Sequence, residues 1–365
     1  MKFSKAGRVA VVAALAAITL TSCATNEGAA SGSTDEVTSD LQGTLVGGGA
    51  SSQQSAQEAW VAAFQGTNPD VTVEYDPAGS GAGRDTFIAG GSSFAGSDRA
   101  FNDEELAADE FASCVPGSGI VELPAYISPI AVIFNLEGID TLNLDAATVA
   151  GIFAGTITNW NDEAIVSQNE DAELPDLAIT AVHRADDSGT TENFTDYLNV
   201  VAPDVWTWEA DGVWPVDGGE AASQTSGVID AVTGGTGTIG YADASRAGDL
   251  GTVAIKVGDE YVPYSAEAAA AIVDASPAAE GRGEGDLAIE LDRASTESGV
   301  YPIVLISYLI GCVEYEDADA ATLVKEYFSY IVSEEGQTVA ADAAGSAPIS
   351  STIAEKSQAA IELIK

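Results

Sequence analysis

The stretch that decides the fold is residues 45–75, LVGGGASSQQSAQEAWVAAFQGTNPDVTVEY. It opens with a short apolar run and closes with the alternating residues VTVEY, and both patterns are typical of strands. Between them, Ala56, Trp60 and Phe64 recur four residues apart, which predicts one buried face of a helix over 55–64. A strand, a helix and a second strand in this order predict an α/β domain with a glycine-rich loop at the first strand's end.

The same alternation of β-rich and helical runs continues to the end of the chain. The apolar run 126–135 predicts a buried strand, in which Pro129 indicates an edge or a bulge. Gly258-Asp259 between two short β-rich runs predicts a hairpin. The remaining expected strands are 178–182, 253–257, 261–264 and 301–310, and the expected helices are 145–153, 191–198, 317–332, 335–343 and 350–364.

The composition of residues 275–299 suggests how the domains are divided. This stretch is rich in Gly, Pro, Ala and charge, so we expect it to carry the chain over a surface back to the first domain. We therefore predict a first lobe built from residues 42–125 and 300–365, and a second lobe from residues 126–299. A ligand cleft is expected between the lobes, with a hinge of crossing segments.

The first forty residues predict export. Lys2, Lys5 and Arg8 precede an apolar run that ends at Leu20, which is typical of a signal peptide over residues 1–22 and too short to span a bilayer. Small residues before Cys23 resemble the lipobox of bacterial lipoproteins, in which the cysteine becomes the lipid-bearing N-terminus. The alternative is an ordinary export signal. Residues 23–41 are small and polar, so we expect a flexible tether and a cell-membrane lipoprotein on the extracytoplasmic face.

Charge and cysteine content exclude several functions. The chain has 57 acidic and 13 basic residues, a formal net charge of −44, which argues against nucleic-acid binding. Three cysteines and one histidine leave little material for a metal cluster, and we expect no metal and no cofactor. In an oxidising compartment Cys114 and Cys312 are expected to form a disulfide, with two separate buried thiols as the alternative.

Three loops each join a strand to a helix and carry a small hydroxyl residue where the helix begins. They are Gly47-Gly-Gly-Ala-Ser51-Ser52, Gly79-Ser80-Gly81-Ala82-Gly83 and the run from Arg184 to Thr191, RADDSGTT. Each hydroxyl is placed as an N-cap. Because helix starts offer unpaired N–H donors and partial positive charge, three of them together predict a pocket for a small anion.

Together with Gly96-Ser97-Asp98 and ITNWNDEAI at 157–165, these loops occur in the order of a known family. The chain resembles the phosphate-binding lipoprotein of the bacterial ABC phosphate importer over nearly all of residues 42–365. The resemblance implies a two-lobed periplasmic-binding-protein fold of type II topology with a hinge between the lobes, and no catalytic activity. It implies inorganic phosphate and an ABC permease and ATPase complex as partners. We expect a monomer whose membrane contact is the lipid alone.

Carried over by position, the family's phosphate contacts fall on eight residues: Ser51, Ser52, Ser80, Asp98, Arg184, Ser188, Gly189 and Thr190. Two departures stand out, because the family usually has an aromatic residue and a proline where this chain has Ser52-Gln53, and a threonine in place of Ser51. Asp186 is expected to orient Arg184. A carboxylate such as Asp98 should repel an anion unless the anion donates a proton to it, which phosphate does and sulfate does not. The alternative for Asp98 is a cap or a salt bridge to Arg99 or Arg184.

Other functions remain open at this stage. His183, Asp186 and Ser188 supply the residue types of a hydrolase or phosphatase, although six consecutive residues rarely aim three side chains at each other. A binding protein for another small oxyanion, stacking of a sugar on the tryptophans and a surface adhesion role are further alternatives.

Overall fold

The computed structural model describes residues 39–108 and 110–365. The predicted signal peptide, Cys23 and nearly all of the predicted tether lie outside these residues. The opening strand–helix–strand prediction is confirmed: β1 (Gly43–Gly49), α1 (Gln54–Thr67) and β2 (Val71–Asp76) follow one another. The two strands pair in parallel. The apolar face of α1 is buried, as its spacing predicted.

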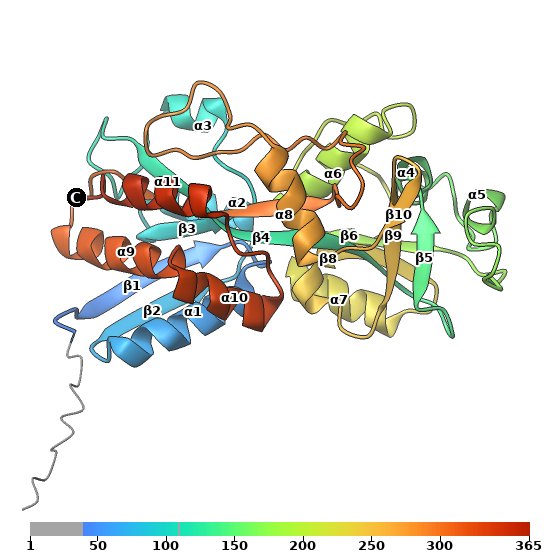
Figure 1. Ribbon diagram of the computed structural model, residues 1–365, viewed down its shortest axis with the longest axis horizontal. Coiled ribbons are helices and arrows are strands. Elements are labelled where there is room, and N and C mark those ends of the chain that lie inside the picture. Colours follow the sequence, from blue (N-terminus) through green and yellow to red (C-terminus); the bar gives the residue numbers. More distant parts are fainter. Residues whose placement is uncertain (1–38, 109) are drawn as a thin grey trace, which may run out of the picture. The chain divides into compact units, whose positions relative to one another are not determined.

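The first lobe contains the strand order β2-β1-β3-β11-β4. In it β3 (Phe94–Ser97) lies parallel to β1, while β11 (Val304–Cys312) runs antiparallel to both β3 and β4 (Ile120–Asn135). Figure 1 shows the C-terminal helices, in red, beside β1 and α1, in blue, so the two ends of the chain build the same lobe. The helices of this lobe are α1, α2 (Ser80–Ile88), α3 (Asp103–Ala108), α9 (Ala318–Ile331), α10 (Glu334–Ala344) and α11 (Ser351–Ile361).

The second lobe continues the same sheet. The far half of β4 pairs with β8 (Thr238–Asp243), followed by β6 (Thr180–Arg184) and β7 (Glu220–Ala222). The hairpin prediction is confirmed, because β9 (Gly251–Val257) and β10 (Glu260–Val262) flank Gly258-Asp259. The other elements are β5 (Thr141–Leu144), α4 (Ala146–Phe153), α5 (Glu163–Val166), α6 (Gly189–Val201), α7 (Gln224–Gly234), η1 (Ala244–Arg246) and α8 (Ala266–Ala275). The residue limits of the two lobes stay a prediction.

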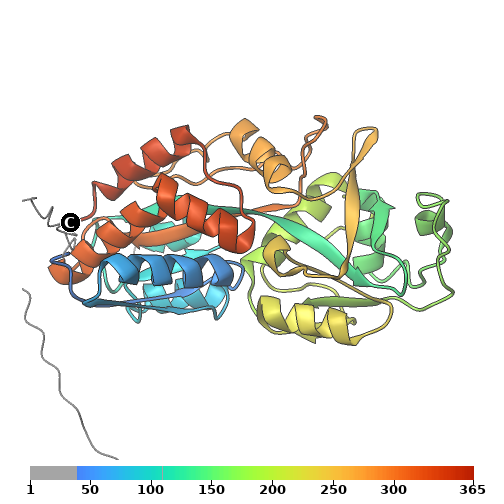
Figure 2. The ribbon, with the colours of Figure 1, turned by 60° about the horizontal axis from the view of Figure 1, so that its bottom comes forward.

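Strand β4 connects the two lobes, and Figure 2 shows it running from one set of helices to the other. It changes neighbours at Pro129: β11 pairs with it up to that residue, and β8 from Ile130 onward. Of the two possibilities expected at Pro129, an edge or a bulge, the bulge is wrong, since the pairing irregularity lies between Ser307 and Tyr308 of β11. A proline is tolerated where neighbours are exchanged, because its missing N–H interrupts no continuous ladder.

The core lies on both faces of the sheet. Every residue of β11 and all but the last of β4 are buried, so both strands have nearly continuous apolar sequences rather than alternating ones. Aromatic side chains fill the space under the first-lobe helices, where Phe94 packs against Tyr327 and Phe328. Trp60 meets Tyr126 edge to face, with ring centroids 6.4 Å apart. Both lobes therefore pack on one continuous sheet.

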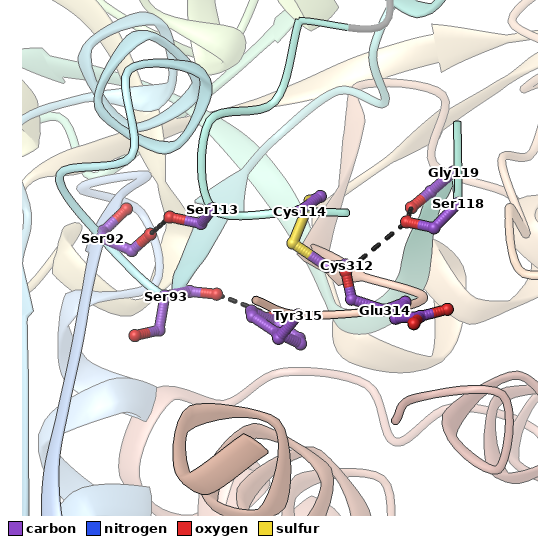
Figure 3. Close-up of a disulfide and its surroundings, with 9 residues drawn as sticks. All are labelled: Ser92, Ser93, Ser113, Cys114, Ser118, Gly119, Cys312, Glu314 and Tyr315. Atoms are coloured by element: carbon purple, nitrogen blue, oxygen red, sulfur yellow. Dashed lines mark hydrogen bonds between the residues drawn. A yellow bond between two sulfur atoms is a disulfide. The ribbon is translucent and has the colours of Figure 1, made fainter. Parts of the chain in front are cut away.

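The predicted disulfide is confirmed: Cys114 and Cys312 are bonded, with Cα atoms 5.3 Å apart. It joins the segment after α3 to the end of β11, across 198 residues of sequence (Figure 3). Close by, the Val115 N–H donates to Glu314 O at 2.8 Å, and the Tyr315 hydroxyl donates to Ser93 O at the same distance. The disulfide thus fastens the C-terminal return of the chain to the first lobe.

The stretch between α8 and β11 crosses the surface without regular elements, as its composition predicted. Isolated bridges pair Ala278 with Ile289 and attach Asp286 to Glu122 of β4. Within the described part of the chain, no helix combines the length and the apolar character needed to cross a bilayer.

Candidate functional site

The predicted site residues come together where parallel strands end. Ser51 and Ser52 follow β1, Ser80 begins α2, and Asp98 follows β3. From the other lobe, Arg184 ends β6, Ser188 caps α6, and Gly189 and Thr190 form the first turn of α6. All eight residues are buried. The carboxyl ends of parallel strands are where ligands bind in such sheets.

Asp98 lies at the centre of this group. Its Oδ1 accepts hydrogen bonds from the hydroxyls of Ser52 and Ser307, both at 2.6 Å. Its Oδ2 accepts one from the Thr190 hydroxyl at 2.8 Å, and its N–H donates to Ser80 Oγ at 3.1 Å. Among residues 39–108 and 110–365, no Arg or Lys lies within salt-bridge distance of this carboxylate. The alternative of a salt bridge to Arg99 or Arg184 is therefore wrong.

Several contacts in the site cross from one lobe to the other. Besides Thr190, Asn193 of α6 donates to the Asp98 carbonyl at 2.7 Å. Ser51 Oγ lies 3.0 Å from Thr225 Oγ1 and accepts from the Thr225 N–H at 3.2 Å. A Cβ at Gly189 would lie 2.6 Å from Asp98 Cβ, so only glycine allows this close approach of α6.

Asp186 holds Arg184, as expected. Arg184 Nε donates to Asp186 Oδ1 at 2.9 Å, and a second guanidinium nitrogen donates to Oδ2. Burial alone would raise the pKa of Asp186, but the hydrogen bonds and charge of Arg184 lower that pKa on balance. The bidentate pair fixes the plane of the guanidinium at the edge of the site.

The prediction that each loop's hydroxyl caps its own helix needs correction. Only Ser188 does so, accepting from the Thr191 N–H at 3.2 Å. Helix α1 is capped by Gln53 and α2 by Gly79, neither with a side-chain capping bond. Ser51 Oγ instead contacts Thr225 Oγ1, Ser52 donates to the Asp98 carboxylate, and Ser80 accepts from the Asp98 N–H. These partners from distant segments take the place of the N–H groups of the local helix. Some first-turn N–H groups have partners, since that of Gly81 donates to Asp187 O at 3.3 Å and that of Gln54 to Ser51 O at 3.4 Å, but the helix starts still carry partial positive charge.

Sequence reasoning missed three residues of the site: Gln53, Thr225 and Ser307. Gln53 is fully buried and donates from Nε2 to Ser307 Oγ at 2.7 Å. Thr225 lies at the start of α7, where a hydroxyl beside a helix start was a signal that could have been recognised. Ser307 is a polar residue inside an otherwise apolar strand, which was also a visible signal.

Charged side chains meet at the edge of the site. We call them the rim cluster, and it consists of Arg84, Arg99, Glu105, Asp187 and Glu192. Arg99 pairs with Glu105 at 2.6 Å and, across the lobes, with Glu192 at 2.8 Å. Arg84 lies 3.4 Å from Glu105 and 3.7 Å from Asp187. Burial alone would lower the pKa of Arg99, but its acidic partners raise that pKa overall.

A cavity of about 670 Å³ borders Asp98 on the side of the rim. Of the eight predicted residues, only Asp98 lines it. Three arginines line the cavity together with six carboxylates, so it carries net negative charge: Arg99, Arg282, Arg293, Asp98, Asp103, Glu192, Asp196, Glu280 and Glu290. The cavity borders the site, and its net negative charge is the wrong sign for an anion site.

The arrangement around His183 does not fit acyl transfer. Its ring nitrogens lie 2.9 Å from Arg184 O and 3.2 Å from Gly218 O, and the ring stacks on Trp214 with centroids 5.0 Å apart. In the described part of the chain no hydrogen bond joins His183 to Ser188. Trp208 and Trp214 each pack on Trp206. The described residues also contain no group of three or more Asp, Glu, His or Cys side chains suited to a metal ion.

Two α/β lobes on one sheet, joined by crossing strands and holding buried polar residues between them, define a periplasmic-binding-protein fold of type II. A family profile described as a PBP superfamily domain matches residues 31–335. Phosphate-binding protein PstS2 of Mycobacterium bovis is 32% identical over 376 residues, covering 100% of both chains. Phosphate-binding protein PstS of Xylella fastidiosa is 29% identical and covers 80% of this chain and 78% of its own. The chain belongs to the PBP superfamily and, within it, to the family of PstS phosphate-binding proteins.

Solved structures agree on the fold. A periplasmic phosphate-binding protein named PfluDING, solved with phosphate, has a TM-score of 0.68 at 21% identity and covers 87% of this chain and 93% of its own. A putative phosphate ABC transporter substrate-binding protein from Clostridium perfringens has a TM-score of 0.59 at 20% identity. The match covers 83% of this chain and 98% of that protein's chain. The two-lobed fold implied by the sequence resemblance is confirmed.

Proposed function

We propose that this protein binds inorganic phosphate between its two lobes and delivers it to the permease and ATPase of an ABC transporter. The observation that carries the proposal is Asp98, a buried carboxylate that accepts three hydroxyl hydrogen bonds where helix starts from both lobes meet. A carboxylate in such a place suits an anion only if that anion brings a proton of its own.

The other residues suit the remaining phosphate oxygens. The N–H groups at the starts of α1, α2 and α6 lack helical partners and favour negative charge. Arg184, held by Asp186, supplies a charge-assisted donor. The proposed ligand contacts are Ser51, Ser52, Ser80, Asp98, Arg184, Ser188, Gly189 and Thr190. Sulfate has no proton to donate near neutral pH, so this site disfavours it.

Binding and release would follow from closure of the lobes. Residues 51, 52, 80 and 98 come from the first lobe, and residues 184 and 188–190 from the second. A ligand that contacts both sets stabilises the closed arrangement, because only that arrangement makes all the contacts. Several relatives carry names of phosphate-binding or phosphate-transport proteins, which supports a role in uptake rather than catalysis.

The predicted signal peptide and Cys23 support a lipid-anchored receptor on the extracytoplasmic face of the cell membrane. Incorporation of labelled palmitate by the full chain, lost in Cys23→Ser, tests the anchor. If the label persists in the variant, it resides on another residue and the assignment fails.

A thermal-shift screen tests the ligand. The purified protein is heated with phosphate, with sulfate and with a panel of sugars, because a ligand of the folded state raises the melting temperature by mass action. We expect phosphate to raise it and sulfate and sugars to leave it unchanged. Stabilisation by a different oxyanion alone would overturn the phosphate assignment. Turnover of a chromogenic phosphate ester that disappears in Ser188→Ala would support a phosphatase instead.

A further inference from the structure

A chain of side-chain hydrogen bonds ends at Asp98, and its other members, Gln53 and Ser307, are not among the eight predicted ligand contacts. Gln53 Nε2 donates to Ser307 Oγ at 2.7 Å, and Ser307 Oγ donates to Asp98 Oδ1 at 2.6 Å. Gln53 and Ser307 are both fully buried. Gln53 stands where the family resemblance leads us to expect a proline.

The direction of each hydrogen bond is fixed by the neighbours. Gln53 Nε2 also lies 3.2 Å from Tyr308 O, and a carbonyl oxygen can only accept, so the Gln53 amide nitrogen must face β11. Gln53 Oε1 accepts from Gln57 Nε2 at 2.8 Å, which holds the same orientation from the other side. Ser307 Oγ therefore accepts from Gln53, and its own proton is directed to Asp98.

A count of lone pairs shows what this does to Asp98. An ionised carboxylate offers about four acceptor positions. Ser52 and Ser307 occupy both positions of Oδ1, and Thr190 occupies one of Oδ2. One position remains, on the oxygen that faces the second lobe.

Among the described residues, no cation is paired with the Asp98 carboxylate. Arg99 is directed to Glu105 and Glu192, and Arg184 to Asp186. The titratable groups whose surroundings include the Asp98 charge are Asp243 at the end of β8 and Tyr75 in β2. Burial chiefly, with this charge adding to it, raises the pKa of Asp243 to about 6 and raises that of Tyr75. Neither group supplies positive charge, so Asp98 depends on neutral donors.

We propose that Gln53 and Ser307 are specificity-determining positioning residues, which hold the Asp98 carboxylate so that one acceptor position stays free for the ligand. The site thereby takes a tetrahedral oxyanion that still carries a proton and rejects one that does not. The proposal rests on the proposed function, since it concerns the same site. Sulfate has no proton for the free position, so it would leave that carboxylate oxygen unpaired.

The test is Ser307→Ala, with phosphate and sulfate affinities measured by isothermal titration at one pH. Without the Ser307 donor, the Asp98 carboxylate is no longer held with its free position toward the second lobe, and the proton of phosphate loses a fixed partner. Phosphate should bind more weakly, by a few-fold to about tenfold, while sulfate, which has no proton for that position, should change little. A lower phosphate-to-sulfate affinity ratio is the expected result, because general damage to the site would weaken both anions alike.

Three further variants make the result specific. Ser307→Thr restores a hydroxyl and should return the wild-type preference. Gln53→Met frees Ser307 and should shift the preference in the same direction as Ser307→Ala, and the double variant should add little, because Gln53 acts through Ser307. Ser357→Ala removes another fully buried serine hydroxyl, one without a hydrogen-bond partner in the described residues, and should change neither affinity.

The outcomes separate this inference from the proposed function. If the wild type binds no phosphate, the proposed function fails. If the wild type prefers phosphate but Ser307→Ala weakens both anions equally or leaves their ratio within twofold, the positioning role is overturned. Circular dichroism and the melting temperature of each variant confirm that folded proteins are compared.

Discussion

Two groups of polar residues join the lobes, and they do so by different chemistry. The interior cluster, which is Ser52, Asp98, Thr190 and Ser307, surrounds one carboxylate with neutral hydroxyl donors. The rim cluster instead pairs arginines with carboxylates, as in the contact of Arg99 with Glu192. The interior therefore keeps a charge available for a ligand, whereas the rim uses its charges on one another.

The difference also separates selectivity from closure. The hydroxyl donors occupy all but one acceptor position of Asp98, so they determine where the carboxylate can accept a proton from the ligand. Ion pairs near solvent are screened by salt and weakly directional, so they hold surfaces together without distinguishing anions. Changes in the interior should alter the preference among anions, and changes in the rim should not.

The largest effect is expected for Asp98→Asn. The amide keeps the shape but replaces one acceptor oxygen by a donor, so phosphate loses the partner of its proton and its affinity should fall about 100-fold. Sulfate loses a repelling charge and should bind no worse than before. Isothermal titration with both anions measures the two changes, and an unchanged phosphate-to-sulfate ratio would remove Asp98 from the selectivity argument.

Asp243 shows what burial does to a carboxylate whose hydrogen-bond donors are not those of the interior cluster. It is fully buried and accepts from the Tyr126 hydroxyl at 3.1 Å and from the Ser245 N–H at 3.0 Å. Burial raises its pKa to about 6 despite these donors. The folded protein then binds a proton between pH 4 and 6 that the unfolded chain has lost, so stability should fall as pH rises through this window.

Urea unfolding across pH 4–7 measures this effect. The wild type should lose on the order of 2 kcal/mol relative to Asp243→Asn, which cannot ionise. The exposed Asp249→Asn is the control and should follow the wild type. Parallel curves for the wild type and Asp243→Asn would show that the hydroxyl donors do offset burial.

Thr190→Val tests the contact that carries the interior cluster across the lobes. Valine keeps the β-branched shape but removes the hydroxyl that donates to Asp98 at 2.8 Å. Phosphate affinity should fall about tenfold, as for loss of one hydrogen bond to a charged group. The loss of phosphate affinity, measured by isothermal titration, should be the same at low and high salt. A strong salt dependence would mean that the Thr190 contact behaves like the ion pairs of the rim cluster.

The contrast between local and long-range contacts explains which features could be predicted from the sequence. Strands and helices such as α1 follow from local periodicity, and Cys114 with Cys312 followed from cysteine number and export. The eight expected ligand contacts came from loop motifs in family order. The link of Gln53 to Ser307 joins residues 254 positions apart, and no local pattern encodes such a distance. The N-cap rule was wrong for Ser80 because a tertiary partner, the N–H of Asp98, displaced the local one.

The smallest effect is expected for Glu192→Gln, which breaks the shorter of the two rim ion pairs that cross the lobes. The Arg99 and Glu192 side chains are 18% and 28% exposed, so solvent screens their attraction. Closure should weaken, and phosphate affinity should fall about two- to fivefold at low salt.

Glu104→Gln is the matched control, because it removes the same charge from an exposed residue of α3 that has no partner among the described salt bridges. Any gain in anion affinity from the lower net charge appears in both variants, so their difference isolates the ion pair. That difference should vanish near ~0.5 M salt, where the Debye length is only a few ångströms. The phosphate-to-sulfate ratio should stay that of the wild type, and a change in it would mean that the rim takes part in selecting the anion.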